Sequence, residues 1–127
     1  MSDALAAVCV FVGGGTGAVL RWAAGRVVGP WDELVGFPWV TLGINVVGSA
    51  ALGVLVVLAK DRPWPWLLLG VGVCGGFTTF STFSAELVKL VDAGRTIAVF
   101  CYACASLAGG FLGVLAAARL ATAVAPT

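Results

Sequence analysis

Charged residues divide this chain into long apolar stretches. No Asp, Glu, Lys or Arg occurs in residues 4–20, 34–59, 63–85 and 96–118. A helix that crosses a lipid bilayer needs about 20 apolar residues, with a range of roughly 17–25. The pattern therefore predicts an all-α membrane protein in a single domain, 1–127. Its four transmembrane helices are expected at about residues 4–27, 38–59, 65–90 and 95–119.

The first stretch has an alternative interpretation as a cleaved secretory signal peptide. It lacks a basic segment before the apolar run, and the glycine-rich core at Gly13–Gly17 is poorly suited to the apolar part of such a signal. We therefore expect this helix to be retained. Short polar segments are expected to connect the four spans, at Gly29–Glu33, Lys60–Pro63 and Asp92–Arg95.

Composition supports a lipid environment. Hydrophobic residues make up 61% of the chain even before its 18 glycines are counted, and only 10% of the residues are charged. A soluble domain has about 45–50% apolar residues with glycine included. Trp residues favour the headgroup region of a membrane, and all five fall at expected span ends. They are Trp22, Trp31, Trp39, Trp64 and Trp66.

Several classes of function find no support in the composition. The net charge is +1, which gives no electrostatic reason to expect nucleic acid as a partner. The chain has no histidine, so the commonest metal ligand and general base are missing. Cys101 and Cys104 have no second cysteine pair to complete a metal site, and we interpret them as small hydrophobic residues. No nucleophile and base are paired, so we expect no enzyme activity.

Basic residues are nearly balanced between the two ends of the spans. Lys60, Arg62 and Arg119 fall on the side of the termini, and the other side carries Arg21, Arg26, Lys89 and Arg95. Orientation normally follows an excess of Lys and Arg on the cytoplasmic side. Near balance predicts insertion in both orientations and an antiparallel homodimer, a two-chain counterpart of inverted repeats. The alternatives are that Arg21 lies too deep to count, that loop acids contribute, or that a second homologous chain is required.

Polar residues inside the spans call for an explanation, because they are costly in lipid. Thr41, Asn45 and Ser49 are spaced four residues apart and form one stripe on the second helix. The stripe alone fits helix–helix contacts and pore lining equally well. In the fourth span, Tyr102 and Ser106 form another pair at this spacing. An interfacial Tyr with a packing Ser explains that pair as well.

The third span contains the densest polar segment, Gly75–Glu86, in which two glycines precede alternating hydroxyl and aromatic residues. This composition disfavours an uninterrupted helix. A break is tolerated at membrane depth where the freed backbone is buried in protein or lines a cavity. The alternative is an intact helix whose hydroxyls bond to carbonyls four residues earlier. We favour a helix broken near its centre.

Three Gly-x-x-x-Gly pairs predict close helix packing, at Gly13 and Gly17, Gly72 and Gly76, and Gly109 and Gly113.

The segment Gly75–Glu86, with the sequence GGFTTFSTFSAE, closely resembles the signature of the Fluc/CrcB fluoride channels. Gly14–Arg21 resembles the first-span motif of this family, and Gly43–Gly48 its second-span asparagine motif. The resemblance covers essentially the whole chain. It implies an antiparallel, dual-topology homodimer in the cytoplasmic membrane of a prokaryote. Such a dimer would export fluoride passively through two pores and hold a central structural sodium ion.

Matched to the family motifs, eight residues are expected at the fluoride pore. They are Asn45, Phe80, Phe83, Thr41, Ser81, Thr82, Tyr102 and Ser106. The resemblance also implies that backbone carbonyls of Gly75 and Thr78 hold the sodium ion. Glu86 matches a pore-region position of the family and Arg21 matches its first-span arginine, and the resemblance assigns neither a role.

The chemistry of these residues suits fluoride, whose strongly held water must be replaced by other donors. An Asn amide offers two N–H donors, and each hydroxyl offers one. A Phe ring presents a positive edge that can face an anion. One rival is a small multidrug-type transporter, which needs a carboxylate within the membrane; here Glu86 lies only at the end of the third span. Another rival is an assembly subunit that carries no ion.

Overall fold

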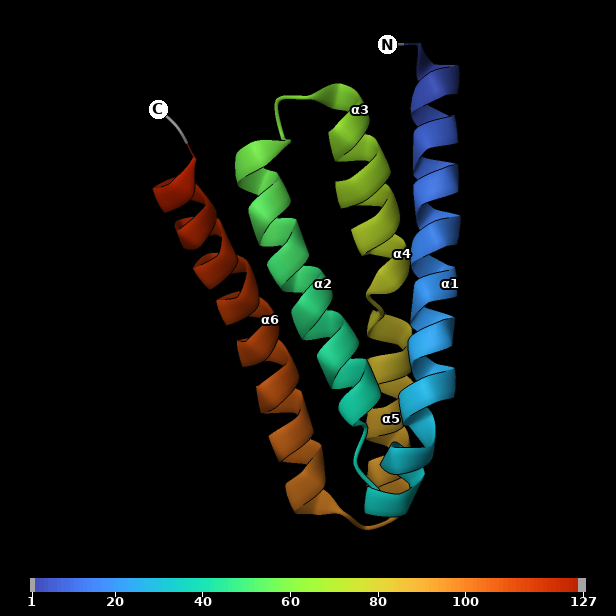
Figure 1. Ribbon diagram of the computed structural model, residues 1–127. Helices are drawn as coiled ribbons and strands as arrows, with labels where there is room; N and C mark the ends of the chain where they lie inside the picture. Colours follow the sequence, from blue (N-terminus) through green and yellow to red (C-terminus); the bar gives the residue numbers. More distant parts are fainter. Residues whose placement is uncertain (1, 126–127) are drawn as a thin grey trace.

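The computed structural model describes residues 2–125, and all the regular secondary structure in that part is helical. Four helical segments are long and apolar enough to cross a membrane, as expected. They are α1 (Asp3–Val35), α2 (Trp39–Leu58), a third segment over Pro63–Asp92, and α6 (Thr96–Val124) (Figure 1). The third segment consists of α3 (Pro63–Pro65), η1 (Trp66–Cys74), α4 (Gly75–Phe77) and α5 (Phe80–Asp92).

The first helix continues well beyond its expected end. The predicted turn at Gly29–Glu33 is wrong, because α1 continues through Pro30 to Val35. A proline removes one backbone donor but does not always end a helix. The stop comes at Gly36, whose φ of 68° is left-handed and whose N–H bonds to the Asp32 carbonyl at 2.7 Å. Glycine is the residue that adopts this helix-ending conformation without a steric cost.

Both chain ends lie at one end of the bundle, together with the connection between α2 and α3 (Figure 1). The connections from α1 to α2 and from α5 to α6 lie at the opposite end. The Arg95 guanidinium joins these two connections by donating to the Gly36 carbonyl. One end of the bundle is therefore held together by a contact between its two loops.

Glycines set the close approach of α1 to the third segment. A Cβ at Gly13 would collide with the Leu68 carbonyl, and one at Gly17 with the Val73 carbonyl. On the other side of the contact, a Cβ at Gly76 would collide with the carbonyl of Gly14. The backbones therefore touch directly, which confirms the packing faces predicted on these two spans.

The α2–α6 contact also depends on small residues. A Cβ at Gly53 would collide with the Val114 carbonyl, and one at Gly109 would lie 2.8 Å from a methyl group of Val46. At Gly113, a Cβ would lie 3.2 Å from the Val46 carbonyl. The third predicted glycine face is therefore also a packing face.

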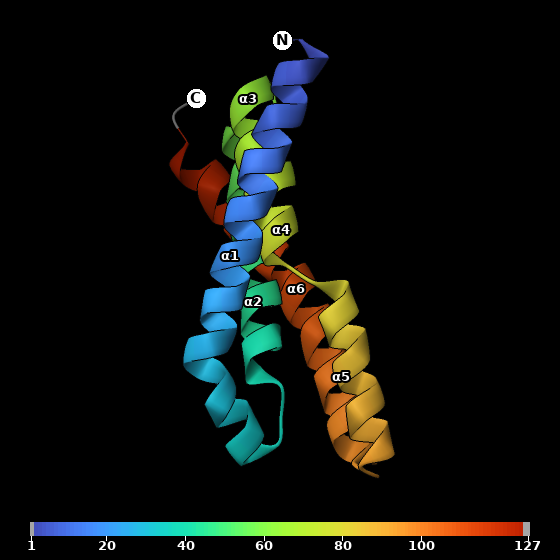
Figure 2. The same ribbon diagram turned by 90° about the vertical axis from the view of Figure 1, so that its right-hand side faces the viewer.

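The backbone of the third segment leaves the helical conformation for two residues. η1 is a π-helix, and α4 continues it to Phe77. Thr78 (φ −76°, ψ 159°) and Thr79 (φ −152°, ψ 122°) are extended, and α5 begins at Phe80. Figure 2 shows the consequence: α4 lies beside α1, whereas α5 leans away from it. The halves of this segment therefore have different neighbours.

Few side chains are buried within one chain. The only buried cluster among the described residues consists of Phe83, Leu90 and Tyr102, at the end where α5 meets α6. Large apolar side chains such as Phe111 on α6 are exposed, by 68% in this case. Lipid and a second protein surface are the environments in which such exposure is favourable.

Candidate functional site

The interruption between α4 and α5 is held by one side chain of α2. Asn45 accepts a hydrogen bond from the Thr79 N–H at its Oδ1 (2.8 Å) and donates from Nδ2 to the Thr79 carbonyl (3.0 Å). A side-chain amide with one donor and one acceptor side matches the two polar groups of an extended residue. Asn45 thereby satisfies backbone groups that would be costly to leave unpaired in lipid.

This pairing changes the hydrogen bonding of the preceding turn. In a continuous helix the Thr79 N–H would bond to the carbonyl of Gly75, four residues earlier. It bonds to Asn45 instead, so the Gly75 carbonyl lacks that helical donor. A Cβ built on Gly75 meets nothing within 4 Å, and the residue is exposed in the single chain. Thr78 bonds through both its N–H (3.0 Å) and its Oγ1 (2.9 Å) to the Cys74 carbonyl.

Three hydroxyl groups converge at the start of α5. The buried Thr79 is the N-cap residue of this helix, and its Oγ1 accepts the Thr82 N–H at 3.1 Å. The same oxygen lies 3.1 Å from the Thr82 hydroxyl and 3.2 Å from the Ser81 hydroxyl. Thr and Ser are favoured at N-caps because their oxygens satisfy free amides of the first turn. Here the cap also gathers neighbouring hydroxyls into one cluster.

A second polar cluster joins three helices around Glu86 of α5. Its Oε1 accepts a hydrogen bond from Thr41 of α2 at 2.8 Å, and its Oε2 accepts one from Tyr102 of α6 at 2.6 Å. Tyr102 is completely buried and Thr41 is 5% exposed. Of the predicted pore residues, Thr41 and Tyr102 are thus brought together by a residue to which no role was assigned.

The aromatic residues form a connected row. The ring centroids of Phe80 and Phe83 lie 5.7 Å apart, and those of Phe83 and Tyr102 lie 5.1 Å apart. Phe37 extends the row, with its ring edge-on to Tyr102 at 5.6 Å. Phe83 is buried, whereas Phe80 is 77% exposed in the single chain. The outer end of the row is therefore available to a neighbour outside the chain.

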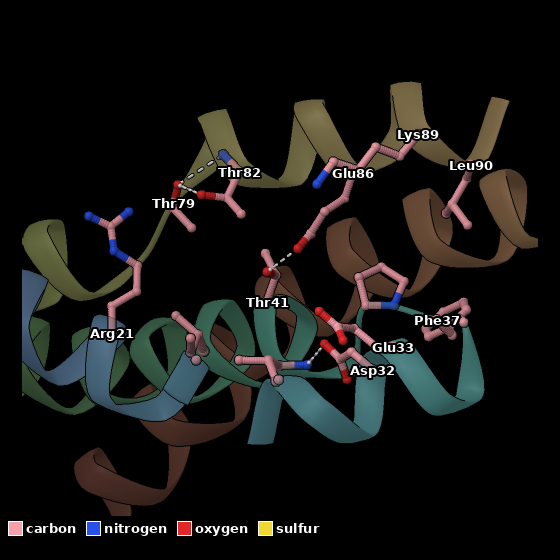
Figure 3. Close-up of a pocket in the computed structure, with 16 residues that line it drawn as sticks. Arg21, Asp32, Glu33, Phe37, Thr41, Thr79, Thr82, Glu86, Lys89 and Leu90 are labelled. Carbon is pink, nitrogen blue, oxygen red and sulfur yellow. Dashed lines mark hydrogen bonds between the residues drawn. The ribbon is translucent and has the colours of Figure 1, made fainter. Parts of the chain in front are cut away.

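A cavity of about 420 Å³ lies on the polar side of α5. Its wall includes Thr79, Thr82, Glu86 and Lys89, and Arg21 of α1 contributes a second cation (Figure 3). The other described lining residues are Gly25, Gly29, Asp32, Glu33, Gly36, Phe37, Pro38, Val40, Thr41, Ile44 and Leu90. We call this space the polar cavity. Its lining residues come from α1, from α2, from α5 and from the connection between α1 and α2.

A second cavity, of about 380 Å³, lies on the aromatic side of α5. Phe80 and Phe83 line it together with Asn45, Thr79 and Ser106. The other lining residues are Gly48, Ser49, Leu52, Gly70, Val71, Cys74, Gly75, Thr78 and Leu107. We call this space the aromatic cavity. Thr79 lines both spaces, so the junction that it forms with Asn45 lies between them.

The remaining predicted residues lie at the edges of this arrangement. The Oγ of Ser106 is buried and has no hydrogen-bond partner among residues 2–125. Gly75 and Thr78 line the aromatic cavity beside it. No three His, Cys, Asp or Glu side chains of the described chain lie close enough to hold a metal ion. A cation at this place would have to be held by backbone or hydroxyl oxygens.

Sequence reasoning missed three residues of the site. Thr79 was identifiable as an N-cap, because a Thr directly precedes the helical run from Phe80. Lys89 lies seven residues after Thr82, and this spacing places it on the face of α5 that lines the polar cavity. Asp32 accepts the Val40 N–H at 3.0 Å and so caps α2 in place of Pro38, which has no capping side chain. No local signal predicts that contact.

Comparison with known proteins gives consistent matches. Residues 8–118 match the family model described as "CrcB-like protein, Camphor Resistance (CrcB)". The chain is 47% identical over 110 residues to "Fluoride-specific ion channel FluC 1" of Halobacterium salinarum, a match that covers 85% of this chain and 87% of that protein. It is 43% identical over 123 residues to "Fluoride-specific ion channel FluC" of Rhodospirillum centenum, covering 91% and 97%.

A further relative is longer than this chain. "Fluoride-specific ion channel FluC 2" of Streptomyces avermitilis is 44% identical over 104 residues, which are 77% of this chain and 63% of that protein.

Proposed function

Because this chain belongs to the CrcB family, we propose that it is a fluoride-selective ion channel and not an enzyme. It is a multi-pass prokaryotic membrane protein with four spans. The names of its relatives support fluoride as the ion. The observation that carries the proposal within the chain is the interrupted third span, where an amide and several hydroxyls gather between two cavities.

The two cavities suggest where the ion would move. Arg21 and Lys89 bring two positive charges to the polar cavity, whose wall also carries the carboxylates of Asp32, Glu33 and Glu86. We propose that an anion would enter beside the two cations. From that cavity the hydroxyls of Thr82 and Ser81 would replace part of its water, as a selectivity filter does. Phe80 and Phe83 would then offer their positive ring edges on the aromatic side. We propose that chloride, which is larger, is excluded at this junction.

We propose that the conducting form is an antiparallel homodimer with two pores. The near balance of Lys and Arg between the two ends of the bundle supports insertion in both orientations. The exposed ring of Phe80 and the open Gly75 lie where a second chain could complete the aromatic cavity. Each pore would lie at the edge of one chain, and the second chain would complete its wall.

We further propose a structural sodium ion between the two chains. The fit rests on the Gly75 carbonyl, whose helical donor is diverted to Asn45, and on the neighbouring Thr78 carbonyl. Carbonyl oxygens freed by a broken helix are suitable ligands for Na⁺ in membrane proteins. When bound, the ion would supply a fixed positive charge near the pores. Gly75 and Thr78 would hold it through their backbone.

Transport is proposed to be passive. Fluoride crosses membranes as its neutral acid from acidic surroundings and dissociates inside, so a channel suffices to release the trapped anion. Among the described residues near the junction, Glu86 is the acidic side chain hydrogen-bonded to Thr41 and Tyr102. A small multidrug-type exchanger would need such a group to release and bind protons during each cycle. We propose instead that Glu86 holds three helices together.

The decisive experiment is fluoride efflux from liposomes that contain the purified protein, measured with a fluoride electrode. A parallel chloride measurement and protein-free liposomes serve as controls. Fluoride release that needs neither a proton gradient nor ATP, without chloride release, is the expected result. Well-folded protein that releases no fluoride would refute the channel and favour a non-transporting assembly subunit. Loss of activity in rigorously sodium-free buffer would support the structural ion, and unchanged activity would contradict it.

A further inference from the structure

Thr79 occupies the point where the two cavities meet, yet its side chain faces the start of α5 and not α2. Its backbone pairs with Asn45, and its hydroxyl bonds to Ser81 and Thr82. The residue is only 7% exposed, although it contributes to the walls of both cavities. One buried residue thus connects the amide of α2 to the hydroxyls of α5.

Three polar groups lie within hydrogen-bond distance of the Thr79 hydroxyl, which has a single proton to donate. A hydroxyl group has one proton to donate and two lone pairs to accept with. The Thr82 N–H takes one lone pair at 3.1 Å. The proton is then directed to the Thr82 oxygen at 3.1 Å. Ser81, at 3.2 Å, can complete the arrangement only by donating its own proton to Thr79.

This arrangement decides which hydroxyl is free to bind an anion. Thr82 receives a proton from Thr79, so its own O–H can point elsewhere. Ser81 uses its O–H on Thr79, and becomes a free donor only when that bond breaks. Both residues are exposed in the single chain, and Thr82 lines the polar cavity.

We propose that Thr79 is a positioning residue for fluoride conduction, whose buried hydroxyl leaves the O–H of Thr82 free to point toward the ion while it holds the O–H of Ser81. Thr79 does not itself contact the ion; it acts through its two neighbours and through the fixed Asn45 amide. The inference rests on the proposed channel function, because it assigns a role within that same pathway. Thr79 is not among the eight residues that the sequence places at the pore.

The test removes the Thr79 hydroxyl by a substitution that keeps the shape of the side chain. Thr79→Val is branched like Thr and tolerates the extended backbone at this position. Thr79→Ser restores the hydroxyl. Thr122→Val is the matched control, because Thr122 is exposed on α6 and bonds only to the Ala118 carbonyl of its own helix. Fluoride efflux from liposomes is compared at equal amounts of assembled protein, with the amount of folded protein measured by size-exclusion chromatography.

Loss of an oriented donor is expected to lower flux of Thr79→Val by about tenfold or more, with Thr79→Ser within about threefold of wild type. The Thr79→Val and Thr82→Val losses should not multiply in the double variant, because both act through the same Thr82 donor. A general packing defect would not be rescued by Thr79→Ser, which is smaller than Val but restores the hydroxyl. Wild-type flux in Thr79→Val, no rescue by Thr79→Ser, or multiplying losses would each overturn the proposal.

Thr79→Asn keeps the test valid if Thr79→Val fails to assemble. Asn is a strong N-cap residue, so it retains an acceptor for the Thr82 N–H, but its donor and acceptor are separate atoms and cannot both take the place of the single Thr79 hydroxyl oxygen. Low flux in this folded variant supports positioning, and wild-type flux would limit Thr79 to capping. The wild-type control distinguishes failure of the proposed channel function from failure of the proposed role of Thr79. If wild-type liposomes release no fluoride, the channel function fails; if they do and Thr79→Val equals them, only the role of Thr79 fails.

Discussion

Asn45 uses both the acceptor and the donor of its amide to hold the Thr79 backbone. Its carbonyl oxygen and one N–H hold the Thr79 backbone, and this leaves a single amide proton for any further partner. A Gln is one carbon longer and an Asp lacks the donor, so neither reproduces both hydrogen bonds. The proposed pore role of Asn45 therefore depends on the one amide proton that its bonds to Thr79 leave free.

We expect Asn45→Asp to abolish most fluoride flux and to destabilise the protein. The carboxylate retains an acceptor for the Thr79 N–H but sets a second oxygen against the Thr79 carbonyl, at a cost of about 1–3 kcal/mol. Its negative charge would also repel the anion. Efflux and thermal unfolding measure the two effects. Thr16→Val, which removes an exposed hydroxyl on α1, should change neither; wild-type efflux in Asn45→Asp would contradict the assigned role.

Phe80→Ile should reduce fluoride flux without lowering the stability of the single chain. The Phe80 ring is 77% exposed, and its one aromatic contact is with Phe83. Its loss should therefore leave thermal unfolding nearly unchanged while reducing fluoride flux, because the positive ring edge is gone. Phe111→Ile is the control, since that ring on α6 is also exposed. Equal flux in the two variants would remove Phe80 from the pathway.

At the scale of the element, α5 depends on a few specific contacts. It leans away from α1 and reaches α2 and α6 through Glu86 and through the aromatic row (Figure 2). Hydrogen bonds therefore contribute more to its placement than they do for α1, which packs by direct backbone contact.

Tyr102→Phe should loosen this helix. The ring would still pack on Phe83, but Glu86 Oε2 would lose its donor at 2.6 Å. An unsatisfied buried acceptor costs about 1–3 kcal/mol, and the partly buried Glu86 should cost no more than this, so the unfolding temperature should fall. Thermal unfolding in detergent measures this change, and Thr122→Val is the matched loss of an exposed hydroxyl. An unfolding temperature equal to that of the wild type would mean that water or a partner replaces the donor.

The sequence allowed the elements to be predicted better than their contacts. Uninterrupted apolar runs identify four spans, since lipid imposes that composition along the whole helix. The end of α1 was misplaced because Pro30 resembles a stop signal, whereas the left-handed Gly36 provides it. The pairing of Thr41 and Tyr102 on Glu86 joins three helices far apart in sequence, so no local pattern reveals it.

For the whole molecule, orientation in the membrane is the first property to measure. We expect a cysteine-free variant carrying Asp61→Cys to be labelled about half by an impermeant thiol reagent added outside cells, because the basic residues are nearly balanced. Asp92→Cys, at the opposite end of the bundle, should behave in the same way. Complete labelling of one position and none of the other would establish a single orientation and exclude the antiparallel homodimer.

The direct backbone contact of α1 with the third segment has a consequence for sequence divergence. At Gly13, Gly17 and Gly76 any side chain would meet a carbonyl group, so neighbouring side chains cannot repack to compensate. Gly15 has nothing within 4 Å of a built Cβ and is free of this restriction within the chain. Within one turn of α1, Gly15 therefore has room for a small side chain, whereas Gly13 and Gly17 have room for none. The main chain therefore fixes the distance between these two helices, whichever apolar side chains surround the contact.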